Sequence, residues 1–263
     1  MKPHNLIRIC VLTIAYVLCL SGHALASTPK VSLNGASAVK EISTEPKQKQ
    51  HPKWLEVCNQ VAPCTSVLCS LAPLPTILHV SQTKSIGSLP LLPYTSMIAN
   101  AVVWALYGHL ARMPSLKYAN IIGISLGSYY FKEWAAAASK SAAGSISYHK
   151  LAISWIVLIN SVVAVRFPRT VATEIIGKEG VFAFIVLFAS PLSALKDVIT
   201  SKSAAAIPLP FTVASTINCT LWSVVGVLLM NDFNIYFPSI LGLLCALVQL
   251  SLKSIYGDGV ASV

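Results

Sequence analysis

The sequence predicts an all-α integral membrane protein in which seven transmembrane helices form two parallel three-helix bundles joined by a linker helix. Three observations predict this fold class: an apolar composition, a series of long apolar segments and an internal repeat. Hydrophobic residues make up 55% of the chain and charged residues 11%, whereas an average soluble domain has roughly 25% charged residues. The composition therefore favours a chain that lies mostly in a lipid bilayer.

Seven apolar segments each approach the ~20 residues that a helix needs to cross a bilayer. They lie at residues 58–80, 91–111, 117–139, 150–167, 180–200, 207–229 and 234–256. The first three form one unit, residues 58–139, and the last three form a second unit, residues 180–256. The segment 150–167 links the units and carries the chain back across the membrane, so both units begin on the same side and are parallel.

The internal repeat consists of special residues that recur after a constant step of 118 positions. The recurring pairs are Pro73 and Pro191, Lys84 and Lys202, Asn100 and Asn218, Trp104 and Trp222, and Gly108 and Gly226. A shared step over this many residues indicates a duplicated membrane unit. In duplicated membrane proteins a binding site typically forms where the two copies face each other, which is typical of transporters.

Residues 1–26 have the features of a secretory signal peptide. A basic stretch precedes the apolar run from Ile9 to Leu20, and Ala24-Leu25-Ala26 follows as a small-x-small cleavage signature. The alternative is an uncleaved eighth span. Residues 27–57 are polar and predict a flexible tail, or else the second half of an organelle address; residues 257–263 form a short C-terminal tail.

Cleavage of the signal peptide places the N-terminus outside and the C-terminus in the cytosol. The distribution of basic residues agrees weakly with this orientation, because cytoplasmic segments carry more Lys and Arg. The expected inner residues are Lys84, Lys132, Lys140, Lys150, Lys196, Lys202 and Lys253, and the outer ones are Arg112, Lys117, Arg166, Arg169 and Lys178. We expect the plasma membrane, or alternatively an organelle membrane reached through the secretory pathway. The net charge of +10 is spread over loops and tail, without the basic stripe that indicates a nucleic-acid partner.

Four prolines lie inside or at the ends of predicted spans and are candidate hinges: Pro73, Pro93, Pro191 and Pro208. Proline removes a helical hydrogen bond and kinks the helix, and membrane helices tolerate this where neighbouring groups satisfy the freed backbone. The alternative is that they are helix-end prolines with no part in motion. Aligning the two halves of the chain also allows Pro210, instead of Pro208, to mirror Pro93.

Together these motifs resemble the SWEET sugar transporters of the PQ-loop/MtN3-saliva superfamily. In the first half the resemblance rests on Ala72-Pro73-Leu74-Pro75-Thr76, Thr83-Lys84-Ser85, Leu92-Pro93-Tyr94, Trp104 to Gly108, and Asn120-Ile121-Ile122-Gly123. In the second half it rests on Ser190-Pro191-Leu192, Thr200-Ser201-Lys202-Ser203, Ile207-Pro208, Leu221-Trp222 to Gly226, Gly242 and Gln249. It covers residues 58–256.

The resemblance implies a facilitator that moves mono- or disaccharides in both directions by alternating access, with the four prolines as flexing points. It also implies a pocket with an asparagine on the third helix of each unit. Asn120 matches the first asparagine, but Ser239 stands in place of the second. A hydroxyl cannot donate and accept across a sugar diol as an amide does, so the substrate class of this chain is open to change.

The residues themselves also predict a sugar pocket. Asn100 and Trp104 lie four positions apart on one helical face, as do Asn218 and Trp222, so each unit presents an amide beside an indole. Neutral amides bind hydroxyls and flat rings stack on sugar C–H faces. The alternative is that the tryptophans belong to interfacial belts and the asparagines join helices. The resemblance also implies a small residue in many family members at the place of Trp104, so the bulk of this indole favours a hexose over sucrose.

Other classes of chemistry have weaker support. No nucleophile, base and orienting group fall together, so we expect no enzyme and no cofactor. The seven cysteines show no metal-ligand spacing; Cys58 and Cys64 are a candidate disulfide, although free thiols are the stronger expectation. The absence of a membrane carboxylate or histidine away from span ends favours facilitated diffusion over proton symport.

The sequence is also compatible with two other functions and with a homo-oligomeric state. A PQ-loop organellar exporter of an amino acid or other metabolite is disfavoured because Pro73-Leu74 and Pro191-Leu192 replace Pro-Gln. A non-transporting receptor or scaffold on the same fold would place charges in the central cavity. A homo-oligomer is compatible with Gly123 and Gly127, whose spacing permits close helix contact, although this spacing equally suits packing within one unit.

Overall fold

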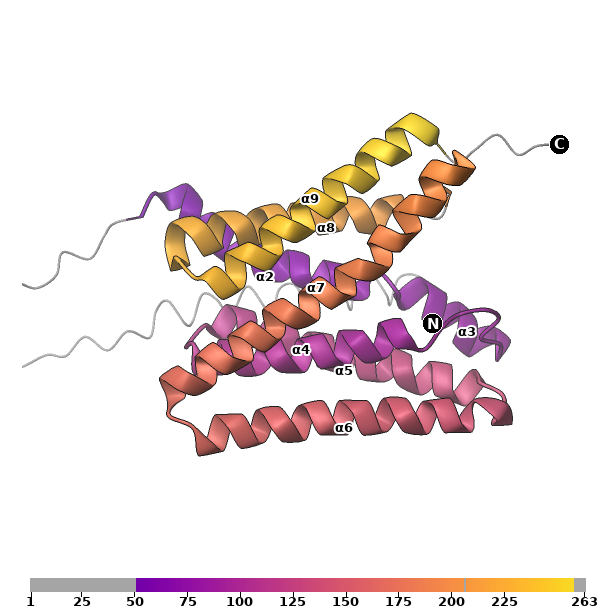
Figure 1. Cartoon of the computed structure of the whole chain (residues 1–263), viewed down its shortest axis with the longest axis horizontal. Helices are drawn as coiled ribbons and strands as arrows, with labels where there is room; N and C mark the ends of the chain where they lie inside the picture. The colour runs from indigo at the N-terminus through magenta and orange to yellow at the C-terminus, as the bar shows by residue number, and fades with distance from the viewer. Residues whose placement is uncertain (1–50, 206, 258–263) are drawn as a thin grey trace, which may run out of the picture.

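The computed structural model describes residues 51–205 and 207–257. Helices α2 (Lys53–Leu71) and α3 (Leu74–Thr83) are followed by α4 (Leu92–Leu110), α5 (Pro114–Ala137), a 3₁₀ turn η1 (Lys140–Ala142), α6 (Ala143–Arg166), α7 (Arg169–Ser201), α8 (Leu209–Val225), a π-helical turn η2 (Gly226–Met230) and α9 (Phe233–Tyr256). In Figure 1 α4, α5 and α6 run roughly parallel to one another, and α7 crosses the bundle obliquely. The predicted signal peptide and most of the predicted tail lie outside the described residues.

Each predicted apolar segment is helical, although the first is divided between α2 and α3. Three helices begin well before the apolar run, and one of them is α6, which begins at Ala143 instead of residue 150. Helix α2 begins at Lys53, so residues 53–57 belong to it rather than to the predicted tail. Helix α7 begins at Arg169 instead of residue 180 and is 33 residues long. Hydropathy misses these first turns because they carry polar side chains, although the turns are helical.

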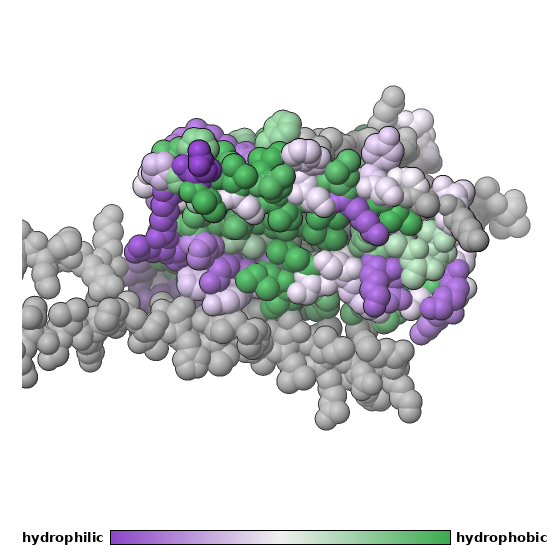
Figure 2. Space-filling model, turned by 90° about the horizontal axis from the view of Figure 1, so that it is seen from below, coloured by the Kyte–Doolittle hydropathy of each residue, from purple (hydrophilic) through white to green (hydrophobic). Residues whose placement is uncertain are grey.

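The described part of the chain has the character of a helical membrane protein. By length and composition alone, four of its helices could cross a membrane, at Lys53–Thr83, Gly144–Arg166, Leu209–Met230 and Phe233–Tyr256. Figure 2 shows apolar residues gathered in the middle of one face and hydrophilic residues towards its two ends. Helix α6 leaves large apolar side chains such as Trp155 and Val165 exposed, as a lipid-facing helix does. The full layout of seven spans stays a prediction.

The two halves of the chain pack with the same topology. In the first triplet α2–α3 and α4 both pack against α5, and in the second α7 and α8 both pack against α9. Across the interface α2 packs against α8, and α4 against α7. The first helix of each triplet thus meets the second helix of the other, as a two-fold relation between parallel repeats requires. The linker α6 packs on α4 and α7.

The repeated lysines end the first helix of each triplet. Lys84 after α3 and Lys202 after α7 both adopt the left-handed conformation, with φ of 55° and 51°. A second pair, Arg112 and Asn231, has φ of 58° and 48° and leads from the second helix of each triplet into the third. Left-handed residues satisfy the last helical carbonyls and turn the chain. The repeat therefore extends to the backbone conformation of Arg112 and Asn231, although their residue types differ.

The repeated glycines mark the closest approach between the second and third helices. A Cβ atom on Gly108 would lie 2.7 Å from the backbone nitrogen of Lys117, and one on Gly226 would lie 2.9 Å from the Cβ of Tyr236. Gly127 likewise packs inside the first triplet, because its Cβ would meet Ile98 at 2.8 Å. Close packing inside one unit of the described fold therefore explains why residue 127 is a glycine. From the sequence, contact between subunits of an oligomer was an equally good explanation.

The predicted hinge prolines differ in their local setting. Pro73 separates α2 from α3, whereas Pro93 is the second residue of α4. Helix α7 continues through Pro191. Pro208 precedes α8, and Pro210 is the second residue of that helix. Pro210 is therefore the positional counterpart of Pro93.

Candidate transport cavity

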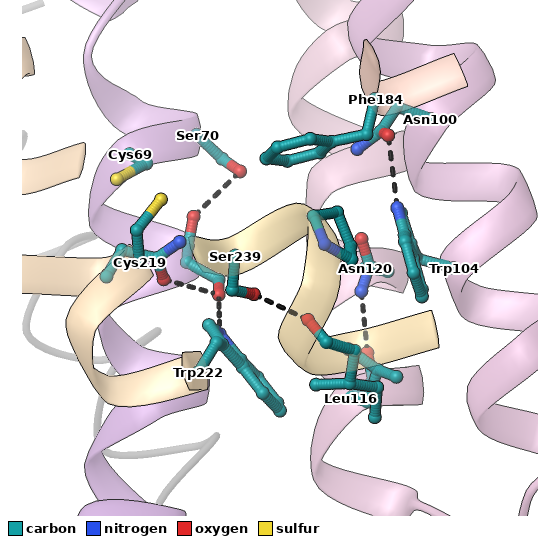
Figure 3. A pocket seen from close by; sticks show the side chains of 14 residues that line it. Cys69, Ser70, Asn100, Trp104, Leu116, Asn120, Phe184, Cys219, Trp222 and Ser239 are labelled. Atoms are coloured by element: carbon teal, nitrogen blue, oxygen red, sulfur yellow. Dashed lines mark hydrogen bonds between the residues drawn. The ribbon is translucent and has the colours of Figure 1, made fainter. Parts of the chain in front are cut away.

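A cavity of about 210 Å³ lies between the two triplets, with walls from α2, α4, α5, α7, α8 and α9 (Figure 3). Its lining residues are Ser66, Cys69, Ser70, Asn100, Trp104, Leu116, Asn120, Phe184, Asn218, Cys219, Trp222, Ile235, Pro238 and Ser239. The structure brings together all six residues that the sequence predicts for substrate binding, which are Asn100, Trp104, Asn120, Asn218, Trp222 and Ser239. Their contact with a substrate stays a prediction.

The cavity walls follow the two-fold relation of the repeats. Asn100 and Trp104 on α4 face Asn218 and Trp222 on α8, and both tryptophans are buried. Other pairs are Leu116 with Ile235, Asn120 with Ser239, and Ser66 with Phe184. The Ser66 and Phe184 positions are separated by the repeat step, yet one is polar and the other aromatic. One side of the cavity is therefore more polar than the other.

Hydrogen bonds fix the more polar side across the triplet interface. Ser66 Oγ on α2 donates to Asn218 Oδ1 on α8 at 2.8 Å, and the Trp222 indole Nε1 donates to Ser66 Oγ at 2.8 Å. Thr65 Oγ1 also donates to Asn218 Oδ1, at 2.9 Å. On the opposite side the Trp104 indole donates to Asn100 Oδ1 of its own helix at 3.1 Å. The two indoles are thus held by different partners.

The pair on the third helices is bound to its own backbone. Asn120 Nδ2 donates to the Leu116 carbonyl at 2.9 Å, and Ser239 Oγ donates to the Ile235 carbonyl at 2.7 Å. Asn120 keeps an amide oxygen and a second N–H for a ligand, whereas Ser239 has used its one proton and can only accept. The replacement of an amide by a hydroxyl therefore removes a donor from this side of the cavity.

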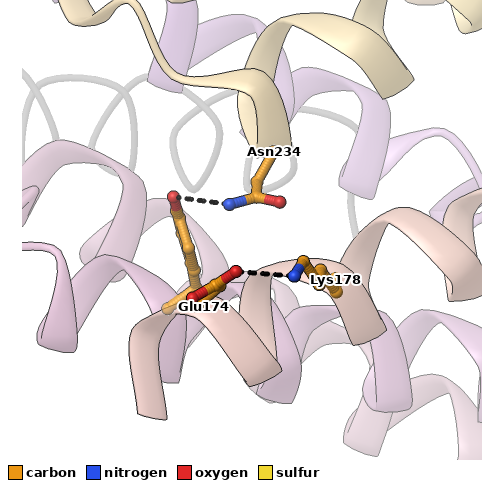
Figure 4. Close-up of polar contacts among 4 residues, drawn as sticks. Glu174, Lys178 and Asn234 are labelled. Atoms are coloured by element: carbon orange, nitrogen blue, oxygen red, sulfur yellow. Dashed lines mark hydrogen bonds and ion pairs between the residues drawn. The ribbon is translucent and has the colours of Figure 1, made fainter. Parts of the chain in front are cut away.

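A polar cluster closes the end of the bundle at which α2 begins, which we call the N-terminal end. The Tyr107 hydroxyl on α4 donates to the Asp232 carboxylate before α9, and Asn234 Nδ2 donates to the same hydroxyl at 3.4 Å (Figure 4). Asp232 also caps α9 by accepting from the Asn234 backbone N–H at 3.0 Å. This cluster joins the first triplet to the second.

Other carboxylates lie outside the cavity lining. Glu133 accepts from Ser81 Oγ at 2.6 Å and joins α5 to α3. Glu179 on α7 accepts from Nδ2 of the fully buried Asn160 on α6 at 2.9 Å. This glutamate directly precedes the predicted segment 180–200. Glu174 pairs with Lys178 at 2.6 Å (Figure 4), and this ammonium lowers the pKa of the exposed carboxyl. The side chain of Asp197 lies outside the described residues.

Several lining residues were not predicted from the sequence. Ser66 and Phe184 were missed, although the repeat step connects them, because neither residue type recurs. Cys69 and Cys219 were missed because no ligand spacing joins them along the chain. The described cysteines Cys58, Cys64, Cys69, Cys219 and Cys245 are all free thiols, which confirms the stronger of the two expectations for Cys58 and Cys64.

Comparison with known proteins decides the family. The family model described as "Sugar efflux transporter for intercellular exchange" matches the chain twice, at residues 57–141 and at residues 174–258. The chain belongs to the SWEET family. The two matched stretches correspond to the two repeats found in the sequence. The SWEET family is one of transporters, so the expectation that this chain is not an enzyme is confirmed.

Individual SWEET relatives cover most of the chain. It is 29% identical over 192 residues to sugar transporter SWEET1 of Dictyostelium discoideum, covering 71% of this chain and 86% of that protein. It is 32% identical over 190 residues to sugar transporter SWEET1 of Drosophila pseudoobscura pseudoobscura, covering 66% and 77%. It is 30% identical over 195 residues to bidirectional sugar transporter SWEET12 of rice, covering 73% and 64%.

The fold also matches a solved SWEET structure. A eukaryotic SWEET transporter aligns with a TM-score of 0.71 and 22% identity over 78% of this chain and 100% of that chain. The likeness confirms the all-α membrane fold that the sequence predicted.

Proposed function

We propose that this chain is a facilitative transporter that moves a monosaccharide in both directions across its membrane by alternating access. The observation that carries the proposal is the composition of the cavity between the two triplets. None of its fourteen lining residues carries a charge at neutral pH, and the polar ones are amides, hydroxyls and thiols beside three aromatic rings. A neutral polyol with apolar C–H faces fits this mixture of groups, and weak neutral contacts allow release. Relatives named sugar transporters support the same substrate class.

Cavity size supports a small sugar. The volume of about 210 Å³ falls below the ~300–1,000 Å³ of sites for drug-sized ligands. Trp104 and Phe184 occupy one side, and Trp104 is fixed there by Asn100 and by contact with α7 at Gly180, where a Cβ would lie 3.0 Å from the indole. We therefore propose that a hexose is preferred over sucrose.

The location of the polar contacts supports alternating access. Tyr107, Asp232 and Asn234 tie the triplets together at the N-terminal end, so entry from that side requires these hydrogen bonds to break. Pro73 interrupts the first span between α2 and α3, where proline leaves a backbone carbonyl without its helical donor. We propose that the triplets rock about the cavity, with Pro73 among the flexing points and the N-terminal cluster opening and closing.

The absence of charged side chains from the described cavity lining supports uniport. No acidic residue or histidine lines the described cavity, so a coupled proton has no acceptor there. We propose that the N-terminal end faces outwards and that the C-terminus is cytosolic, as the predicted signal peptide and the basic residues suggest. An organelle location and disaccharide transport are the alternatives, which localisation by tagging and the next experiment distinguish. A homo-oligomer stays a prediction.

The proposal is tested by uptake of radiolabelled glucose, fructose and sucrose into cells that lack their own hexose carriers. The intact chain is compared with Asn120→Ala and Trp222→Ala at matched surface expression. Ser125→Ala is the matched control, because Ser125 is exposed on α5 and donates only to its own helix. We expect saturable hexose uptake that both cavity variants abolish, that Ser125→Ala leaves intact and that a protonophore does not change. Absence of uptake of every sugar by correctly inserted protein would contradict the proposal and favour a metabolite exporter.

A further inference from the structure

Two thiols from different triplets lie on one wall of the cavity. Cys69 on α2 and Cys219 on α8 both line it, and in Figure 3 their sulfur atoms lie beside each other. Neither thiol takes part in the amide and indole hydrogen bonds described above, so the proposed sugar site leaves them without an assigned role.

The neighbouring contacts place the two thiols at the same level of two touching helices. Cys69 lies one helical turn after Ser66, and Cys219 directly follows Asn218. Because Ser66 Oγ and Asn218 Oδ1 are 2.8 Å apart, α2 and α8 are in direct side-chain contact at this level. The indole of Trp222 reinforces the contact through Ser66. The thiol pair therefore spans the interface between the triplets and does not belong to one triplet alone.

The number of ligands restricts the chemistry of an ion bound here. Among the described residues no three His, Cys, Asp or Glu side chains gather into a group, which excludes the four-coordinate zinc sites made from such residues. Two thiols suit soft cations that accept linear two-coordination, such as Cu(I), Ag(I) and Hg(II), because thiol sulfur is a soft ligand. Hard cations such as Mg²⁺ and Ca²⁺ prefer oxygen ligands.

We propose that Cys69 and Cys219 form a two-thiol binding site for a soft d¹⁰ metal cation inside the cavity. Thiolate sulfur is the metal ligand, so an ion held by both sulfurs displaces both thiol protons, and no electron is transferred. The occupied site is then neutral with a divalent ion and carries one negative charge with a monovalent ion, so an uncharged cavity favours the divalent ion. Resting on the proposed transport function, we also infer that a bound ion blocks transport, because it ties α2 to α8 and occupies the sugar's space.

Metal binding is measured first, on the purified full chain, so that the test does not depend on transport. Ag⁺ and Hg²⁺ are titrated separately, and sulfur coordination is read by X-ray absorption. We expect one ion with two sulfur ligands that is lost in both Cys69→Ser and Cys219→Ser, with apparent affinity at least about tenfold lower in each. Cys58→Ser and Cys64→Ser are the matched controls, since these α2 cysteines do not line the cavity. Unchanged two-sulfur binding in either Cys69→Ser or Cys219→Ser would overturn the site.

Hexose uptake is measured second. Low concentrations of Ag⁺ or Hg²⁺ are expected to stop uptake by the intact chain and by Cys64→Ser, to leave Cys69→Ser at its own untreated rate, and to act more slowly when glucose fills the cavity. If the metal occupies both cysteines while uptake continues, the metal site stands and the proposed sugar path through this cavity fails. If uptake stops equally in Cys69→Ser, the block has another origin and the inferred mechanism is wrong.

Discussion

Ser66 and Phe184 hold equivalent positions in the two repeats and face the same cavity, but only Ser66 makes a hydrogen-bonded link to the opposite triplet. Ser66 accepts from Trp222 and donates to Asn218. Phe184 stands near Trp104 and Asn100 in the same view (Figure 3). The duplicated fold thus surrounds a cavity whose two sides differ in polarity, and a bound sugar would be oriented by this difference.

Ser66→Ala is expected to weaken sugar binding without preventing folding. The change removes the acceptor for the Trp222 indole and one donor to Asn218, so both side chains gain freedom beside the substrate. Each of the two lost neutral hydrogen bonds contributes about 1 kcal/mol, and a loss of this size corresponds to at least about a fivefold rise in the half-saturating hexose concentration. Uptake kinetics measure this rise, and Ser154→Ala on the exposed face of α6 is the control. An unchanged concentration dependence would show that Ser66 does not position the indole.

Phe184→Ala is expected to enlarge the cavity and raise sucrose uptake relative to glucose uptake. The phenyl ring lines the less polar side, and its removal vacates space next to Trp104. Phe182→Ala is a close control, because Phe182 lies two residues away on α7 with 68% of its surface exposed. The ratio of initial sucrose and glucose uptake rates is the measurement. A ratio that rises equally in both variants would mean that cavity volume does not limit the size of the sugar.

Tyr107→Phe and Asp232→Asn are expected to affect transport through one shared interaction. The phenol donates to the carboxylate across the triplets, and a hydrogen bond to a charged group contributes about 1.5–3 kcal/mol. Asp232→Asn keeps an oxygen that can cap α9, so it tests the contact more cleanly than truncation. In a double-mutant cycle on uptake rates, the double variant should resemble the single variants, with a coupling energy above about 0.5 kcal/mol. Additive effects would indicate that the two residues act separately; Tyr148→Phe, at an exposed tyrosine, is the control.

Gly177→Ala is expected to destabilise the protein, whereas Gly144→Ala is not. A Cβ on Gly177 would lie 2.6 Å from Asn234 Nδ2 and 2.7 Å from the Tyr107 ring, so either α7 or these two hydrogen-bonded side chains would have to shift. Gly144 on α6 has no heavy atom within 4 Å of such a Cβ, and alanine is favoured over glycine in a helix by about 1 kcal/mol. Thermal unfolding in detergent should show a lower Tm for Gly177→Ala and an equal or higher Tm for Gly144→Ala. The opposite order would show that α7 is not held at this crossing.

Much of the fold follows from local properties of the sequence. Lys84 and Lys202, and Gly108 and Gly226, recur with one step because each ends a helix or permits a helix crossing at the same place in its triplet. The starts of α2, α6 and α7 were misplaced because polar side chains in a helical turn lower hydropathy without changing the backbone. Hydropathy and composition are averages over a segment. At a helix end the side chains become polar while the backbone is still helical, so these averages place the end of the helix too far inside it.

The sequence by itself determined the helical membrane class, the duplicated triplets and the six predicted residues that line the cavity, because repetition and apolar length are encoded along the chain. Only the tertiary structure decided which of these residues touch. Two such pairs, Ser66 with Asn218 and Tyr107 with Asp232, come from opposite triplets. Such pairs depend on how the helices cross and rotate against each other, which is set by the packing of the whole interface and leaves no spacing pattern in the chain.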